Sequence, residues 1–312
     1  MLSIFACPKP FRGHIGIIQR NAIGSWKQLQ PPCEIFLFGD EEGTAVAAKE
    51  LGVSHVPDVA RNEFGTPFLN DVFKKGEQLA TYPIHCYVNS DIILGRGFML
   101  AITKLTQWRR RFLMVGECWN LDVTEAVPFN NPTWEQNLNV AVSQRGKLRG
   151  IGAIDYFVFP RGLYHEIPAF VLGRAAFDNW LIWRARNLKA PVVDATQVVT
   201  AIHQNHDYFH IAGGSYSTLH GQEAMSNLQL AGGMRHCYHI SDATHKLLST
   251  GIRWNWRGDL RVEARTKPMK EQARRAFWWL VEWTRSVRHP LGLHKQNWRK
   301  LQNVLFGEKR FY

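Results

Sequence analysis

The chain has 312 residues, of which 45% are hydrophobic and 21% are charged, so it can bury a substantial core and is not a largely disordered protein. Its five scattered cysteines form no CxxC pair, which argues against a disulfide framework or a zinc site and favours reduced thiols in a cytoplasmic protein. The net charge of +12 is local, because residues 253–312 hold 15 Lys and Arg against 5 Asp and Glu, whereas residues 1–252 contribute only +2.

Short apolar runs alternate with amphipathic segments from the first residues onward. The runs are bounded by Gly, Pro or polar residues and predict buried strands, whereas the segments between them have helical spacing. This β-α-β-α-β order predicts a parallel sheet, in which ligands bind at the carboxyl ends of the strands. The loops after Ala6 and Phe38 are therefore the first places to expect a ligand. The predicted strands cover residues 2–6, 34–38 and 53–56, and the predicted helices cover residues 15–29 and 44–51.

The alternation continues, with interruptions, to about residue 210. Residues 120–149 are polar and poorly patterned, which predicts a long loop or lid with a short helix near 135–145. Residues 207–250 are rich in Gly, His and Ser and have no clear pattern, whereas residues 271–287 have strong helical spacing. Further predicted strands cover residues 84–88, 112–116 and 155–159, and further helices cover 68–79, 98–107 and 178–190. Apolar segments lie at 92–94, 192–193 and 198–202.

The strongest chemical signal is the turn Asn89-Ser90-Asp91, which follows one predicted strand and precedes a second apolar run. A carboxylate at a strand end can hold a divalent cation. Such a cation neutralises the diphosphate that leaves when a nucleotide sugar reacts. A solvated Asx turn between two strands is the alternative explanation.

The order of these parts resembles the GT-A family of glycosyltransferases, which have a nucleotide-binding αβ half, an Asp-any-Asp turn at a strand end and an acceptor half. Asn89-Ser90-Asp91 is similar to that turn, with its first acid replaced by Asn. The first strand and its loop, the helix segment from Arg20 to Trp26, and the second strand ending in Gly39-Asp40 also resemble the family, over residues 2–210. The resemblance implies an α/β domain of GT-A type in residues 1–250, with a mixed, mostly parallel sheet flanked by helices. It further implies sugar transfer assisted by Mn2+ or Mg2+.

The resemblance also places the nucleotide at the first two strand ends, against the loop from Ala6 to Pro8 and against Asp40. A carboxylate at an exposed strand end can accept a hydrogen bond from a base N–H, although Asp40 can equally cap a helix or a turn. Gly65 and Thr66 precede a helix, where a glycine allows close approach of a ligand to the backbone, and an ordinary turn is the alternative. The candidate nucleotide-sugar-binding residues are Ala6, Pro8, Arg20, Asp40, Gly65, Thr66, Asn70, Asn89, Ser90 and Arg161.

Asp178 begins a predicted helix in the segment Gly173 to Trp180. This segment resembles the acidic segment of inverting GT-A enzymes, which implies that Asp178 is the catalytic base. An acceptor hydroxyl that attacks an anomeric carbon must lose its proton, and a carboxylate can take it. A helix-capping aspartate is the alternative, and a cap can also serve as a base.

Three histidines and an aspartate fall within residues 203–210. The GT-A resemblance implies that a late His or Asp completes the metal site, and either His206 or His203 can supply a neutral imidazole. We therefore predict Asp91 and His206 as metal ligands. A polar surface loop with incidental histidines is the alternative.

Two basic features remain. Arg161 follows a predicted strand, where its guanidinium can bind a diphosphate bidentately, although a surface salt bridge explains it equally well. Residues 251–312 form a basic, Trp-rich extension that we predict to be helical. Its tryptophans favour docking on the domain, and its arginines leave peripheral contact with an anionic membrane open. We do not expect nucleic acid as a partner.

The sequence thus predicts a cytoplasmic glycosyltransferase that uses a nucleotide-sugar donor and an acceptor of unspecified class. A sugar-nucleotide nucleotidyltransferase is the first alternative, but its glycine-rich loop is matched here by Cys7 to Gly13 with a single glycine. A non-catalytic binding module that uses the basic tail is the second alternative.

Overall fold

The computed structural model describes residues 2–206 and 219–266, and the chain divides into two compact units, residues 1–254 and 255–312. The described part of the second unit contains helix α9 (Trp256–Thr266). The predicted helix at 271–287 and residues 207–210 of the histidine-rich segment 203–210 lie outside the described residues. In the ranges that are described, no helix combines the length and the apolar character needed to cross a membrane.

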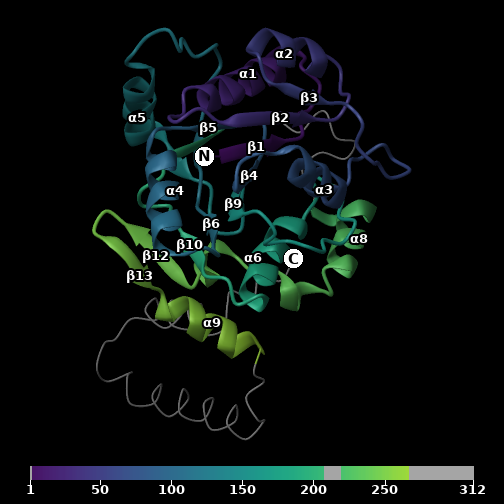
Figure 1. The fold of residues 1–312 in the computed structure, drawn as a ribbon, viewed down its shortest axis with the longest axis vertical. Coiled ribbons are helices and arrows are strands. Elements are labelled where there is room, and N and C mark those ends of the chain that lie inside the picture. Colours follow the sequence, from purple (N-terminus) through teal and green to yellow (C-terminus); the bar gives the residue numbers. More distant parts are fainter. Residues whose placement is uncertain (1, 207–218, 267–312) are drawn as a thin grey trace, which may run out of the picture. The chain divides into compact units, whose positions relative to one another are not determined.

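A nine-stranded sheet forms the centre of the first unit, in the order β13-β12-β10-β6-β9-β4-β1-β2-β3 (Figure 1). Seven of its strands run in one direction, and only β9 and β13 are antiparallel to their neighbours. The predicted α/β fold with a mixed, mostly parallel sheet is therefore confirmed. The strands are β1 (Leu2–Ala6), β2 (Glu34–Phe38), β3 (Ser54–Val56), β4 (Ile84–Val88), β6 (Leu113–Val115), β9 (Tyr156–Pro160), β10 (Val192–Asp194), β12 (His245–Leu248) and β13 (Gly251–Trp254).

The antiparallel strand β9 lies between β4 and β6, in the middle of the sheet. Its register pairs Val88 with Tyr156 at one end and Ile84 with Pro160 at the other. The residue before β9, Asp155, consequently lies at the same edge as the carboxyl ends of the parallel strands. Arg161, which follows β9, lies at the opposite edge.

Helices flank the sheet and bury apolar side chains in the core. Helix α2 ends at Gly52, which adopts the left-handed conformation with φ of 64°. In α1, the indole of Trp26 is fully buried, and its Nε1 donates to the carbonyl of Ile92 at 2.9 Å. The helices are α1 (Gly13–Lys27), α2 (Thr44–Leu51), α3 (Leu69–Leu79), α4 (Gly97–Trp108), α5 (Trp134–Arg145), α6 (Phe177–Asn187) and α8 (Gln222–Leu230), with 3-10 turns η1 (Met234–His236) and η2 (Ile240–Asp242).

A second, four-stranded sheet has the order β5-β11-β7-β8. Strand β5 begins directly after the Asn89–Asp91 turn, and β11 pairs with it antiparallel, so that His203 lies opposite Ile92. This sheet was not expected from the sequence, and it is what carries a late histidine to the acidic turn. Its strands are β5 (Ile92–Leu94), β7 (Trp119–Leu121), β8 (Lys147–Leu148) and β11 (Ala201–Gln204).

The segment between β7 and α5, which the sequence marks as a loop or lid, is held by Asn21 of α1. The Asn21 side-chain amide donates to the carbonyl of Glu125 at 2.9 Å and to Oε1 of Gln204 at 3.0 Å. Its Oδ1 accepts from the backbone N–H of Val127 at 2.8 Å. One buried amide therefore connects α1, this segment and β11.

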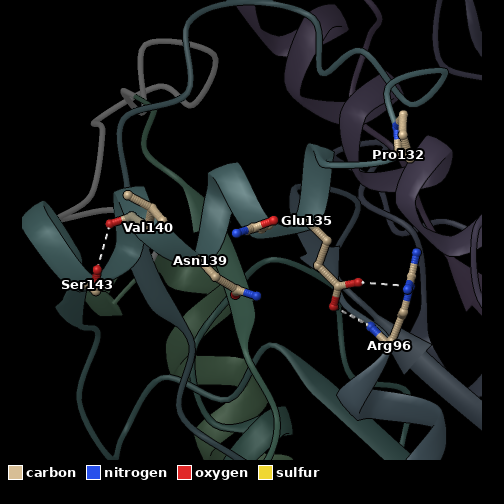
Figure 2. Close-up of a pocket in the computed structure, with 7 residues that line it drawn as sticks. Arg96, Pro132, Glu135, Asn139, Val140 and Ser143 are labelled. Atoms are coloured by element: carbon tan, nitrogen blue, oxygen red, sulfur yellow. Dashed lines mark hydrogen bonds and ion pairs between the residues drawn. The ribbon is translucent and has the colours of Figure 1, made fainter.

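Helix α5 is fixed separately to the start of α4. The carboxylate of Glu135 accepts from the backbone N–H of Arg96 at 2.7 Å and pairs with its guanidinium at 3.2 Å (Figure 2). A surface hollow of about 480 Å³ is lined by Arg96, Pro132 and residues of α5. None of the acidic-turn or late-histidine residues lines this hollow, so it is separate from the candidate site.

Candidate active site

Asp91, His203 and His206 converge at the carboxyl edge of the large sheet. Each offers one ligand atom, and these three atoms lie within 4.8 Å of one another. Nε2 of His206 is 3.1 Å from Oδ2 of Asp91, and Nε2 of His203 is 3.9 Å from the same oxygen. The structure therefore brings the two predicted ligands together and adds His203 to them.

The charge states of these groups suit a divalent metal ion. Burial alone would raise the pKa of Asp91, but the hydrogen bond from His206 and the charges of His203 and Lys9 lower it well below its usual range. Burial lowers the pKa of His203, which favours the neutral imidazole that binds metals. Oδ1 of Asp91 is buried and accepts no hydrogen bond in the described part of the chain, so this carboxylate has an unused ligand atom. The donor set and the orphaned oxygen together fit a bound cation.

Asn89 does not replace the missing acid, because its side chain is already engaged. Its amide donates to Oδ1 of Asp155 at 3.0 Å, and its backbone N–H donates to the Asp155 carbonyl at 2.9 Å. The other carboxylate oxygen of Asp155 lies 3.3 Å from Nε of Arg149. Nη1 of Arg149 in turn lies 2.9 and 3.0 Å from the two ring nitrogens of His203. Asp155 thus positions both the acidic turn and a cation, Arg149, beside the candidate metal ligands.

Ser90 and Lys9 are held by the side chain of Gln19, which is buried in α1. Oε1 of Gln19 accepts from the backbone N–H of Lys9 at 2.7 Å and from Oγ of Ser90 at 2.8 Å. The Gln19 amide donates back to the Lys9 carbonyl at 2.8 Å. The loop after β1 is therefore fixed relative to the acidic turn after β4.

Asp178 lies in the first turn of α6, where it is half-buried and interacts electrostatically with Asp155 and Arg149. It is not the N-cap, which is Ala176, a residue in the left-handed region with φ of 85°. Oδ1 of Asp178 accepts from the backbone N–H of Asn179 at 2.9 Å. Burial raises the pKa of Asp178 to about 7; this hydrogen bond opposes the rise, and nearby Asp155 adds to it. A carboxyl group with this pKa can accept and release a proton near neutral pH.

Arg61 interacts with the segments after β1, β2 and β3 that contain predicted nucleotide-binding residues. The sequence did not indicate this role for Arg61. Its guanidinium donates to Oδ1 of Asp40 at 2.6 Å and to Oε1 of Glu41 at 2.9 Å. It also donates to the carbonyl of Gly65 at 2.7 Å. The thiol of Cys7, between Ala6 and Pro8, interacts electrostatically with the same charges, and burial raises its pKa to about 12.

Thr66 belongs to a neighbouring network centred on Glu223 of α8. Glu223 accepts from Thr66, from Asn62 at 2.7 Å and from Nε of Arg174 at 2.7 Å, and these partners, against the effect of burial, lower its pKa. Arg174 precedes α6, so Glu223 links the loop containing Gly65 and Thr66 to the segment that presents Asp178.

Three predicted residues are not brought to the metal-ligand cluster. Arg161 donates to the carbonyls of Glu77 and Ala80 at the end of α3, on the far edge of the sheet, because β9 is antiparallel. Arg20 pairs with Glu50 at 2.9 Å on the outer face of α1 and α2. Asn70 lies in the first turn of α3, where its buried Oδ1 accepts no hydrogen bond from any described residue.

Sequence reasoning missed Asp155, Arg149 and Arg61 as site residues. It considered Lys9 only as part of the loop from Cys7 to Gly13, which it compared with the glycine-rich loop of the nucleotidyltransferase alternative. Isolated charged residues have no periodic pattern, so nothing in their sequence neighbourhood distinguishes them from surface charges. The position of Asp155 at the start of a predicted strand was the one available signal, but it required knowing that the strand runs antiparallel.

No family model matches the chain, and no curated protein matches it. Among solved structures, it is similar to glucosyl-3-phosphoglycerate synthase from Mycobacterium tuberculosis, crystallised with Mg2+ and UDP, at 12% identity and a TM-score of 0.46 over 75% of this chain and 80% of that one. It is also similar to S. aureus TarS residues 1–349, at 9% identity and a TM-score of 0.40 over 59% of this chain and 54% of that one.

Proposed function

We propose that the protein is a metal-assisted glycosyltransferase that moves a sugar from a nucleotide-diphosphate sugar to an acceptor hydroxyl. The observation that carries this proposal is the convergence of Asp91, His203 and His206 at the carboxyl edge of the sheet, with Asp178 nearby. One part of the site can hold a cation, and the other can hold a proton.

The two parts match the two demands of the reaction. Mn2+ or Mg2+ held by Asp91, His203 and His206 would supply the positive charge that stabilises a leaving diphosphate. Asp178, with a pKa of about 7, would take the proton from the acceptor hydroxyl as that oxygen attacks the anomeric carbon. Arg149 and Lys9 add positive charge on the side where the diphosphate would lie.

The donor would bind along the strand ends from β4 to β2. The loop from Ala6 to Pro8, Asp40 and Gly65 would surround the nucleoside, because Arg61 already draws these segments together. The acceptor would approach from the side of α6. The proposal places the protein in the cytoplasm. It also includes peripheral contact between the basic extension and an anionic membrane.

The proposal is tested with the Asp91→Asn variant and a panel of UDP-, GDP- and TDP-sugars, each with and without Mn2+. Wild type should be stabilised by one of these donors in thermal unfolding, and more so with Mn2+, because a specific ligand stabilises the folded state by mass action. Asp91→Asn should remain folded at the assay temperature but lose donor turnover by about 100-fold or more.

Asp58→Asn, which changes an exposed aspartate after β3, is the matched control and should behave as wild type. Full donor turnover by Asp91→Asn, or the absence of any donor effect in wild type, would reject the proposal.

A further inference from the structure

The ammonium group of Lys9 lies among the atoms that would bind the metal. Its Nζ is 3.2 Å from Nε2 of His206 and 3.9 Å from Oδ2 of Asp91. The first of these is the ring nitrogen that would bind the metal, and the second is the carboxylate oxygen that lies near both histidines. A divalent ion bound to the same two atoms would have to occupy the space beside them that this ammonium now fills.

Lys9 differs from Arg149, the other cation of the site, in what holds it there. Arg149 has a carboxylate partner of its own in Asp155, outside the set of metal-ligating atoms. Among the described residues, Lys9 has only Asp91 within ion-pair distance. The charge of Lys9 is therefore balanced by the carboxylate of Asp91, which is also the carboxylate that would bind a metal ion.

The backbone of Lys9 cannot move aside with its side chain, because Gln19 fixes both its N–H and its carbonyl. The side chain is partly exposed, with about a third of its surface accessible. A flexible four-carbon chain on a fixed backbone can swing its charged end while the loop stays in place. A divalent ion at contact distance would repel the ammonium, and this repulsion favours a conformation of the side chain that points away from the ion.

We propose that Lys9 is a tethered substitute for the metal ion: its ammonium occupies the metal position when no ion is bound, and it turns to the donor's diphosphate when the ion enters. This inference rests on the proposed function and adds a role for a residue to it. Binding of the metal and binding of the diphosphate are then coupled, because the metal ion displaces the ammonium of Lys9, and this ammonium then pairs with the diphosphate.

The test measures Mn2+ binding without nucleotide, by titration calorimetry, in wild type and in Lys9→Met. Removing the competing ammonium should lower the Kd for Mn2+ at least fivefold. With saturating Mn2+, the affinity for the tightest binder among UDP, GDP and TDP should fall at least fivefold in the same variant. A merely structural role of Lys9 would not raise the affinity for Mn2+ while lowering the affinity for the nucleotide. Lys49→Met, an exposed lysine of α2, is the control and should change neither value.

A second measurement uses wild type alone and needs no variant. The acetylation rate of Lys9 by a small amine-reactive reagent, followed by peptide mass spectrometry, should rise when Mn2+ is added, relative to Lys49. An Mn2+ affinity of Lys9→Met equal to or below that of wild type, or an unchanged labelling rate, would overturn the inference.

The proposed function fails in a distinguishable way. If Asp91→Asn weakens Mn2+ binding while Lys9→Met leaves it unchanged, only the role of Lys9 is rejected. If wild type binds no Mn2+ with or without a nucleotide, both proposals are rejected.

Discussion

Asp178→Asn should make the protein more stable at alkaline pH while abolishing its activity. The pKa of Asp178 is raised from 3.8 to about 7 in the folded chain, mainly by burial, so the folded protein keeps a proton that the unfolded chain releases. Below about pH 4, both states are protonated and the group has no effect. Between about pH 4 and 7, only the unfolded state ionises, which lowers the free energy of unfolding as pH rises.

The size of the effect follows from the shift of about three pKa units. At about 1.4 kcal/mol per unit, the full penalty above pH 7 is up to about 4 kcal/mol. At pH 5 it is about 1.7 kcal/mol by the same relation. Asn cannot ionise, yet its oxygen can still accept from the backbone N–H of Asn179. The stability of Asp178→Asn relative to wild type should therefore increase by between about 2 and 3 kcal/mol from pH 5 to pH 8.

Urea unfolding of both proteins at pH 5 and pH 8 measures this difference. Glu166→Gln, an exposed carboxyl between β9 and α6, should show the same difference from wild type at both pH values. In donor turnover, wild type should gain about tenfold in rate between pH 6 and pH 8, as the base becomes ionised, and Asp178→Asn should lose about 100-fold or more. A stability difference that does not change with pH would show that Asp178 holds no proton, and would refute the reasoning.

Three further outcomes are expected. His206→Gln should raise the Kd for Mn2+ about tenfold or more in calorimetry, because it removes one of three ligand atoms; an unchanged Kd would remove His206 from the site. Gly76→Ala should destabilise the protein by about 1–3 kcal/mol in urea unfolding, although helix propensity alone favours Ala, because a Cβ would lie 2.7 Å from the ring of Phe5; a stabilised variant would contradict this. Trp26→Phe should cost about 1–3 kcal/mol, since the Ile92 carbonyl loses its buried donor, and a neutral result would show that the bond is dispensable.

The sequence predicted the elements of the fold well, because strand and helix periodicities are local. The strands at 34–38 and 84–88 and the helix at 44–51 have the predicted bounds. Strand direction and pairing are not local properties. The sequence predicts a strand at 155–159, close to the observed β9, but only the antiparallel position of this strand in the sheet places Arg161 away from the site and Asp155 at it.

The same limit applies to the candidate site. Asp91 and Asp178 were predicted because a motif resemblance marks them. The structure places Asp178 near Asp155 and Arg149, and it places Asp91 near His203, which Arg149 contacts. Lys9 and Arg149 belong to two different loops, and what brings them into the site is their short distance to Asp91, His203 and His206. Such distances depend on tertiary packing, which no spacing along the chain encodes.

The anchoring of the 122–127 segment by Asn21 has a consequence for how substrates reach the site. This segment is bonded to Asn21, and Asn21 also donates to Gln204, which itself donates to the carbonyl of Asp91. The segment therefore cannot swing open alone. It forms a fixed side of the site, and the N–H of Val127 should exchange with solvent deuterium as slowly as the core amides of α1. In the proposed reaction, donor and product would then exchange across the neighbouring loops, while the candidate metal ligands keep their positions.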